Sequence, residues 1–569
     1  MHGRYAVLFV AYIAAYGAVL WCRHRLPPLP PDDAPESVFA AQRALPWLEH
    51  LTNTPHPLNS RENERIRSWL FSELQGLYRL AEVHGHVVEF FDDNVVITEK
   101  DSHGRYFKLP ETTFIYESSN LLIRLRGTSE NRQALMLTAH FDSVPTGFGA
   151  TDDGIGVVTL LEVFRALIYA PRQEQDLIFA FCNGEETALF SSRAFKQHDL
   201  FNETLAFINL EGTGPGGRAL LFRANNPFLL KLYAASVPYP HASVMGNDVF
   251  RLGLVQSGTD YDVYNTIRSG LDVAFYEHRS LYHTQRDSFE NVLPESIQHI
   301  GENTLAFAKA YTKLADGDLI SGTIKPNSDF IVFYDILGRF MIVQQPHEFA
   351  LYSTVLLLTS AAIIFASIYV QNISVKTQLF GILNSLAILI IAIIAALTLT
   401  SISVAFLIFF QPLIVYRDVI IVQLLLFVVA SYGVYFVAES KVQSGPHEQL
   451  TSENDFHDQA IVITASMIHI GSAVFWWFLA LACFTLSMIF RIGALYFVNW
   501  FLIGASISLL THFAFRFIPM IDWMFQLCFS LILPVVILLD MAVALTSSLS
   551  QTVADGSPAL PGNYEYDFN

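Results

Sequence analysis

The chain has 569 residues, of which 52% are hydrophobic and 15% charged, and its formal net charge is −18 at pH 7. This composition is too apolar for a protein that is soluble throughout. The apolar residues are concentrated in the second half, so a globular part and a membrane part are predicted. The acidic balance argues against a nucleic-acid partner. The four cysteines form no spacing motif, which argues against a disulfide framework and against a thiolate zinc site.

The N-terminal segment 1–26 is predicted to be a transmembrane anchor. Residues 5–22 form an uncharged apolar run that is long enough to cross a bilayer. A cleaved signal peptide is the alternative, but the sequence Trp21-Cys22-Arg23-His24 does not resemble a small-residue cleavage site. The proline-rich segment 27–34 then reads as a semi-rigid linker.

The second half is predicted to form a polytopic transmembrane domain over residues 345–548, with six to eight helices. Its apolar runs are 350–371, 378–411, 418–438, 461–490, 493–512 and 519–546. The run 378–411 exceeds one crossing and is long enough for two short helices with a break near Thr398–Ser401. The longest polar loop is expected at 438–460, and the acidic tail 549–569 is expected to be disordered.

The ionisable residues within these apolar runs include His469, His512 and Asp540. An ionisable group inside a bilayer indicates a functional site by default. The alternative is that His512 lies near an interface while the other two form hydrogen bonds within the helix bundle.

Residues 35–330 are predicted to form one α/β domain. A helical pattern covers 35–51, and Ser60 is placed to cap a second helix. A third helix is expected at 156–167. Strands are expected at 87–91, 94–98, 120–125, 134–140, 176–181, 206–211, 219–223 and 273–277. This alternation predicts a mixed, largely parallel sheet flanked by helices.

Metal-binding side chains follow these strands or open the loops beside them. Strand ends that meet at one edge of a sheet are where an α/β protein gathers its ligands. Histidines and carboxylates without cysteine are typical of catalytic zinc, which keeps a coordination position open. Each residue alone has an ordinary structural explanation, but together they predict a metal centre. The candidates are His140, Asp152, Glu186, Glu211 and His283, with Glu185 beside them.

The motifs that carry these residues resemble the two-zinc aminopeptidase Y family (clan MH). They are H-F-D-S, G-A-T-D-D-G-I-G, N-G-E-E-T-A-L-F-S-S, N-L-E-G and Y-H-T-x-x-D-S. The segment P-H-P-L-N-S-R-E-N and the apolar second half are similar to the membrane-bound members of the vacuole and endoplasmic reticulum. The resemblance covers about residues 35–310 and implies the zinc-exopeptidase (phosphorylase/hydrolase-like) fold.

The resemblance also implies roles for individual residues, all around two Zn²⁺ ions. His140 and Glu211 would hold one ion, Glu186 and His283 would hold the other, and Asp152 would bridge them. Glu185 would be the general base.

Three further features are implied around these ligands. Asp142 would fix the imidazole of His140, and Asp287 would support the loop of His283. The peptide bond between Asp152 and Asp153 would be cis. By contrast, S-G-T-D-Y-D (257–262) matches the substrate-side loop of the family only approximately, so residue preference does not transfer.

The predicted function is that of a membrane-anchored zinc metallopeptidase, an aminopeptidase that hydrolyses peptides in the lumen of the vacuole or endoplasmic reticulum. Its partners would be a peptide substrate and the lipid bilayer. The glycosylation sequon at Asn202 agrees with a luminal domain. The alternatives are a glutaminyl-cyclase-like acyltransferase, a non-catalytic membrane scaffold, and a transporter with an accessory domain. Membrane-bound members of the family also continue into a C-terminal luminal domain, which this sequence is expected to lack unless it is a shorter form.

Overall fold

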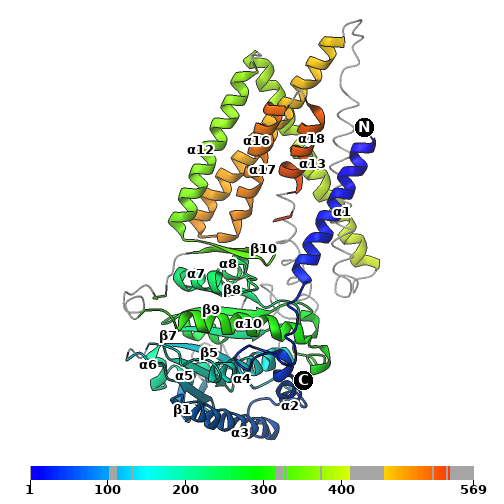
Figure 1. The fold of residues 1–569 in the computed structure, drawn as a ribbon. Helices are drawn as coiled ribbons and strands as arrows, with labels where there is room; N and C mark the ends of the chain where they lie inside the picture. The colour runs from blue at the N-terminus through cyan, green and yellow to red at the C-terminus, as the bar shows by residue number, and fades with distance from the viewer. Residues whose placement is uncertain are drawn as a thin grey trace. The chain divides into compact units, whose positions relative to one another are not determined.

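The computed structural model in Figure 1 describes residues 2–101, 112–130, 133–255, 257–315, 324–326, 330–371, 374–410, 454–515, 518–532 and 536–537. The chain divides into two units. The first, called here the helical unit, combines Met1–Trp21 with Pro346–Ser550. The second, the α/β unit, contains the described residues of Cys22–Gln345.

A seven-stranded sheet forms the centre of the α/β unit. Its order is β1 (Val88–Asp92), β4 (Leu121–Leu125), β6 (Leu177–Cys182), β5 (Ala134–His140), β7 (Thr204–Gly212), β9 (Ser269–Phe275) and β8 (Leu220–Ala224). The four strands β6, β5, β7 and β9 run parallel, whereas β1, β4 and β8 are joined antiparallel at the two sides. The predicted mixed α/β sheet is therefore confirmed.

The central strands are buried along their whole length because helices cover both faces of the sheet, as is usual for parallel strands. On one face α4 (Ile155–Ile168) packs against β5, β6 and β7, and α2 (Ala41–Leu51) and α10 (Pro294–Tyr311) pack against α4. The other helices of this unit are α3 (Arg61–Val83), α5 (Phe190–Phe195), α6 (Asp199–Glu203), α7 (Pro227–Ser236), α8 (Val244–Arg251) and α9 (Asp260–Tyr264). As predicted, Ser60 caps α3, accepting a hydrogen bond from the backbone N–H of Asn63 at 3.0 Å.

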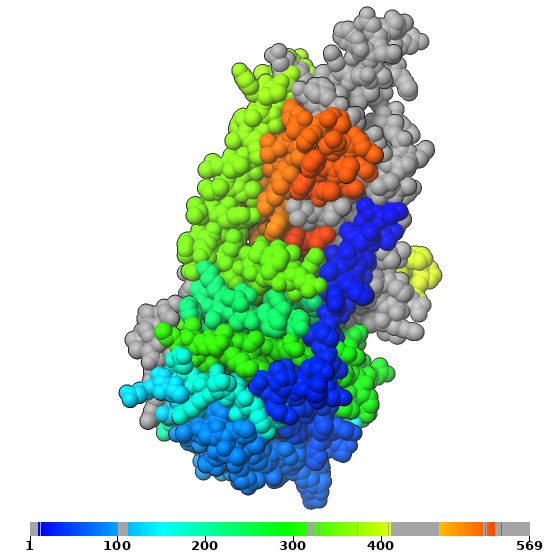
Figure 2. All heavy atoms as spheres, in the orientation of Figure 1, coloured from blue at the N-terminus to red at the C-terminus, as the bar shows by residue number. Residues whose placement is uncertain are grey.

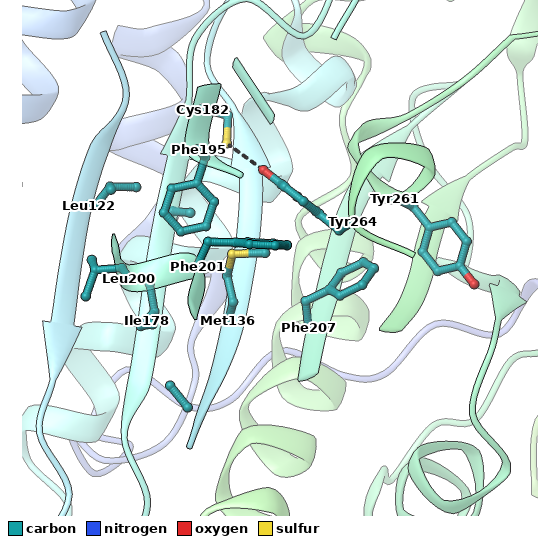
Figure 3. Close-up of a cluster of buried hydrophobic side chains, with 12 residues drawn as sticks. Leu122, Met136, Ile178, Cys182, Phe195, Leu200, Phe201, Phe207, Tyr261 and Tyr264 are labelled. Atoms are coloured by element: carbon teal, nitrogen blue, oxygen red, sulfur yellow. Dashed lines mark hydrogen bonds between the residues drawn. The ribbon is translucent and has the colours of Figure 1, made fainter. Parts of the chain in front are cut away.

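The opposite face of the sheet carries a core of buried aromatic side chains (Figure 3). Met136, Ile178 and Phe207 come from the strands and meet rings supplied by α5, α6 and α9. Because side chains alternate along a strand, these residues fill one face while their sequence neighbours face α4. The sheet is thus fixed from both sides, which holds the ends of its strands in place.

Three strands, β3, β10 and β11, were not predicted from the sequence. β3 (Thr112–Glu117) forms a separate hairpin with β2 (Val96–Asp101), which was predicted. β10 (Val332–Ile336) and β11 (Phe340–Gln344) form a second hairpin at the end of the α/β unit.

Four helices of the helical unit are long and apolar enough to cross a membrane among the residues searched. These spans are Pro346–Val370 in α12, Val375–Leu407 in α13 (Val375–Phe410), Ser466–Phe490 in α16 (Asn454–Phe490) and Gly493–Phe515 in η4 (Gly493–Tyr496) and α17 (Phe497–Phe515). The unit also contains the part of α1 (His2–His24) up to Trp21, α18 (Pro519–Gln526) and the short turn η5 (Leu527–Ile532).

The structure corrects two sequence predictions in this unit. Residues 378–410 of this run lie in one continuous helix, α13, with no break near Thr398–Ser401. Residues 398–401 contain neither proline nor glycine. Their serine and threonine hydroxyls can donate a hydrogen bond to a carbonyl of their own helix. In addition, α16 begins at Asn454, inside the segment predicted as a polar loop. The run 418–438, Asp540 and the tail 549–569 lie outside the described residues.

His512 is buried inside the helix bundle. It is 3% exposed, and its Nε2 lies 2.9 Å from Ser466 Oγ while its Nδ1 lies 2.9 Å from Asp522 Oδ2. The ring of His469 lies 4.5 Å from the ring of His512. These polar side chains thus satisfy one another between α16, α17 and α18, as buried polar groups must in an apolar environment.

Candidate metal centre

The sequence-predicted metal ligands come together at the carboxyl ends of the parallel strands. His140 is the last residue of β5, and Glu211 lies near the end of β7. Asp152 lies in the turn η1 (Ala150–Gly154), Glu186 follows β6, and His283 follows β9 beyond the turn η2 (Arg279–Leu281). They form two groups, His140–Asp152–Glu211 and Asp152–Glu186–His283, with the ligand atoms of each group within 4.8 Å of one another.

Asp152 is shared by both groups and presents a different carboxylate oxygen to each. Its Oδ1 lies 3.1 Å from His140 Nε2, and its Oδ2 lies 3.0 Å from His283 Nε2. Glu211 Oε1 is 3.5 Å from the same nitrogen of His140, and Glu186 Oε2 is 3.4 Å from that of His283. The arrangement is therefore two imidazole–carboxylate pairs joined by one central carboxylate.

Glu185 lies beside this cluster without belonging to either group of ligands. Its Oε2 is 4.0 Å from His140 Nε2, and the residue is 8% exposed. Burial raises the pKa of Glu185 well above its usual value; His140 opposes the shift, and the carboxylates of Glu211 and Glu186 add to it. A carboxyl group in this environment holds a proton more readily than one in water.

Asp142 fixes both His140 and the turn that carries the two glutamates. His140 Nδ1 lies 3.0 Å from the Asp142 carbonyl oxygen and 3.4 Å from its Oδ1. The Asp142 carboxylate also accepts backbone N–H groups of Gly184 at 2.7 Å, Glu185 at 3.2 Å and Glu186 at 3.2 Å. One buried carboxylate thus orients residues on both sides of the cluster, in the manner of an outer partner of a metal site.

Asp287 performs a similar task for Asp152. Its Oδ1 accepts hydrogen bonds from Thr151 N at 2.9 Å and Thr151 Oγ1 at 2.5 Å, and its Oδ2 accepts one from Asp152 N at 3.3 Å. The peptide bond between Asp152 and Asp153 is cis, as predicted. Asp287 therefore supports the turn that carries Asp152. The sequence had predicted that it supports the loop that carries His283.

The cluster has three carboxylates and only two histidines to neutralise them. This excess of negative charge is what bound metal ions would balance. Two buried oxygens, Glu186 Oε1 and Glu211 Oε2, have no hydrogen-bond partner among the residues that the structure describes. Burial, reinforced by the neighbouring Asp152, raises the pKa of Glu186 to about 7 and that of Glu211 to about 8, although the nearby histidines oppose both shifts. Divalent cations would remove both the unmet coordination and the charge imbalance, so the residues fit a metal site.

Two buried acidic residues near the centre were not among the predicted site residues. Asp153 accepts hydrogen bonds from His140 N at 3.3 Å and Gly156 N at 3.2 Å. Asp260, which is 1% exposed, has a carboxylate oxygen without a hydrogen-bond partner. The second aspartate of G-A-T-D-D-G-I-G and the S-G-T-D-Y-D segment contained the signal, but a sequence does not reveal which of two adjacent acidic residues is buried.

Asn202, the glycosylation candidate, lies away from this centre. It is exposed in α6, which ends at the residue before β7, whereas Glu211 lies at the other end of that strand. Asn202 is thus accessible at the opposite edge of the sheet.

Comparison with known proteins identifies this part of the chain. Residues 120–308 match the model of peptidase family M28. The matched range contains all eight predicted residues of the centre, from His140 to Asp287. The peptidase resemblance drawn from the motifs is therefore confirmed.

Curated relatives extend the similarity into the apolar half. A vacuolar membrane protease of Schizosaccharomyces pombe is 39% identical over 263 residues, 46% of this chain and 30% of the relative. A vacuolar membrane protease of Schizosaccharomyces japonicus is 33% identical over 471 residues, 80% of this chain and 51% of the relative. The chain thus spans about half the length, or less, of these two relatives.

Among solved structures, a zinc aminopeptidase from Bacillus subtilis is 14% identical and covers 51% of this chain and 97% of its own, with a TM-score of 0.36.

Proposed function

We propose that the protein is a membrane-anchored metallopeptidase with two zinc ions, which removes residues from the N-termini of peptides. The observation that carries this proposal is the position of Asp152, whose two carboxylate oxygens face His140 at 3.1 Å and His283 at 3.0 Å. A carboxylate between two imidazole–carboxylate pairs is the arrangement that two metal ions with a shared ligand require.

Each residue of the centre then has a defined task. His140 and Glu211 would hold one zinc ion, Glu186 and His283 the other, and Asp152 would contribute one oxygen to each. Bound zinc supplies a water of lowered pKa and polarises the carbonyl of the peptide bond. Glu185 would accept the proton of that water and return it to the amine that leaves. Its burial, its position outside both ligand groups and its raised pKa support this role.

Asp142 is proposed to position this proton acceptor. Because its carboxylate accepts the backbone N–H groups of Gly184, Glu185 and Glu186, it sets the direction in which the two adjacent glutamates leave the chain. One glutamate can then face the metal ligands while the other faces the reacting water. Asp287 serves the same purpose for Asp152 through the bonds at Thr151.

The proposed location is the vacuolar membrane, with the α/β unit in the lumen. The names of the two yeast relatives and the four long apolar helices support a vacuolar membrane protein. Exposure of Asn202 supports glycosylation at that sequon, which occurs on the luminal side. Glycosidase treatment should increase the gel mobility of the wild-type protein and leave Asn202→Gln unchanged. A wild-type protein without such a shift would argue against the luminal location.

The decisive experiment compares wild-type protein and Glu185→Gln on a library of peptides with free N-termini. The substitution keeps the shape of the side chain but removes its ability to accept a proton. Turnover should therefore fall by about 100-fold or more, in the range associated with loss of a general base. The metal content, measured by elemental analysis, should stay at that of the wild type.

Two controls define the reaction. Chelator should abolish cleavage and added zinc should restore it, while peptides with an acetylated N-terminus should resist cleavage if the enzyme is an aminopeptidase. Full activity in Glu185→Gln would refute the assigned base. Cyclisation of N-terminal glutamine in place of hydrolysis would instead identify an acyltransferase.

A further inference from the structure

The first residues of the α/β unit are bound into its interior, close to the segment that leads to His283. Arg23 is 3% exposed, although arginine is seldom buried without a specific partner. Its Nη2 donates a hydrogen bond of 2.6 Å to the hydroxyl of Tyr276, which directly follows β9. The next residue, Glu277, is also buried, and its Oε2 lies 3.4 Å from His24 Nδ1.

The Tyr276 hydroxyl is a junction between Arg23 and the end of the α/β unit. It lies 3.3 Å from His241 Nε2, and His241 Nδ1 lies 3.1 Å from Asp335 Oδ1 in β10. Asp335 is held in turn by backbone N–H groups of Ala242 at 2.8 Å and Gly338 at 2.6 Å. A buried polar chain therefore runs from residue 23 through Tyr276 to the last hairpin of the unit.

A second set of contacts fixes Glu277 against the turn that follows Glu211. The space beside Gly217 is filled by Glu277, because a Cβ at this glycine would lie 2.4 Å from the Glu277 carboxyl carbon. A Cβ at Gly214 would lie 2.1 Å from the Glu277 carbonyl oxygen. Burial would raise the pKa of Glu277, but His24 and Arg23 lower it, so the carboxylate is ionised opposite them.

The chain between Tyr276 and His283 is short and bonded to itself. Leu281 N donates to the His278 carbonyl at 2.9 Å, and Tyr282 N donates to the Arg279 carbonyl at 3.0 Å. The ring of Tyr282 then stacks on that of His283, with centroids 3.7 Å apart. A displacement of Tyr276 is therefore transmitted to His283 through only two tight turns.

We propose that Arg23 is a positioning residue for the metal centre, which acts through Tyr276 to hold the loop that carries His283. This inference rests on the proposed two-zinc site and adds to it a part outside the matched peptidase segment, in the stretch that follows the first apolar run. The dark-blue stretch is visible on the face of the α/β unit shown in Figure 2, whereas the side chain of Arg23 is buried.

The test measures metal binding by the full-length protein, with Arg23→Met and Tyr276→Phe as the two informative variants. Metal-free protein is titrated with zinc against a fluorescent chelator. Each variant should bind the zinc ion of the Asp152–Glu186–His283 group about tenfold more weakly, the lower end of the range for lost outer partners. Affinity for the other ion should change by less than about twofold. Because both variants break one connection, the double variant should be no weaker than either alone.

Arg25→Met is the matched control. Arg25 is an exposed arginine two positions away. Its carbonyl oxygen accepts a hydrogen bond from Arg218 Nη2 at 2.9 Å, and this bond does not involve the Arg25 side chain. This variant should bind both ions like the wild type. Circular dichroism establishes that each variant is folded at the temperature of the titration. Tyr276→Phe keeps the ring and its packing, so it serves if Arg23→Met does not fold.

Equal weakening of both ions, or no weakening of either, would refute the positioning role. Selective weakening of the ion of the Asp152–Glu186–His283 group would support it, because a general loss of stability does not discriminate between two ions that share Asp152. Selective weakening of the other ion would refute it. A wild-type protein that binds two zinc ions but cleaves no peptide would refute the proposed hydrolysis, and the titration would still decide the role of Arg23.

Discussion

His140 and His283 occupy corresponding places on the two sides of Asp152, but the fold holds them in different ways. The side chain of His140 is 1% exposed and that of His283 is 38% exposed. His140 ends a central strand that is buried on both faces. His283 lies in a loop with a positive φ of 59°, a conformation uncommon for residues other than glycine.

The metal centre thus has a strand-held half, the His140–Asp152–Glu211 group, and a loop-held half, the Asp152–Glu186–His283 group. The two halves are fixed by different contacts before any ion binds. Strand pairing and Asp142 fix His140, so this half depends on the sheet. The His283 half depends on individual tethers, among them the hydrogen bond from Thr146 Oγ1 to the His283 carbonyl at 2.8 Å and the stacked ring of Tyr282. We expect the strand-held half to bind metal more tightly and the loop-held half to be the side open to substrate.

The strongest test of this comparison removes what the two halves share. Asp152→Asn takes away the central negative charge while preserving size, so both ions should be lost or bound far more weakly. Peptide cleavage should fall by more than about 100-fold, beyond the usual effect of an outer partner. Metal content and cleavage rate are measured on the same preparation. Asp32→Asn, the same substitution at an exposed residue, is the control. Retention of both ions would show that Asp152 does not bridge the two halves.

The next test changes each histidine separately. His140→Ala leaves the buried carboxylates of Asp152 and Glu211 without their imidazole partner, which costs about 1–3 kcal/mol of stability. His283→Ala also removes an imidazole partner from Asp152 and Glu186, but this side chain is 38% exposed and water can enter in its place, so the loss of stability should be smaller than for His140→Ala. Unfolding is followed by circular dichroism in the metal-free protein.

Metal content separates the same two variants in a second way. His283→Ala should retain about one zinc ion per chain, because the strand-held group stays complete. His140→Ala should retain less, since the loop-held group has fewer fixed supports. Equal stability and equal metal content in the two variants would contradict the distinction between the halves.

The sequence predicted the sheet, and it predicted residues that the fold brings together, because both leave strong local patterns. Apolar runs such as 134–140 and 176–181 correspond to strands buried on both faces, and each ends at or just before a polar residue of the centre. Parallel strand ends must meet at one edge, so the meeting of His140 with Glu211 follows from the order of the elements.

Contacts that depend on the packing of distant segments had no such pattern. Arg23 reads as a charge that flanks an apolar run, and nothing in the sequence connects it to Tyr276, which lies 253 positions away. The second strand of the hairpin, β3, was missed because its alternate residues are partly exposed and its pairing with β2 is decided by tertiary structure. The predicted break in α13 is wrong because serine and threonine do not end a helix in apolar surroundings, where their hydroxyls bond to the helix itself.

The smallest expected effect concerns the ring that covers His283. Tyr282 stacks on His283 with an angle of 20° between the rings, and such pairs contribute about 0.5–1.5 kcal/mol beyond buried area. Tyr282→Leu should therefore weaken the zinc ion of the loop-held half by no more than about tenfold. Tyr282→Phe keeps the stacked ring and should bind both ions like the wild type. If Tyr282→Phe binds both ions normally but turns over peptide more slowly, the hydroxyl acts in the reaction itself. The loop-held half would then supply a group for the substrate as well as a ligand for the metal, whereas the strand-held half supplies ligands alone.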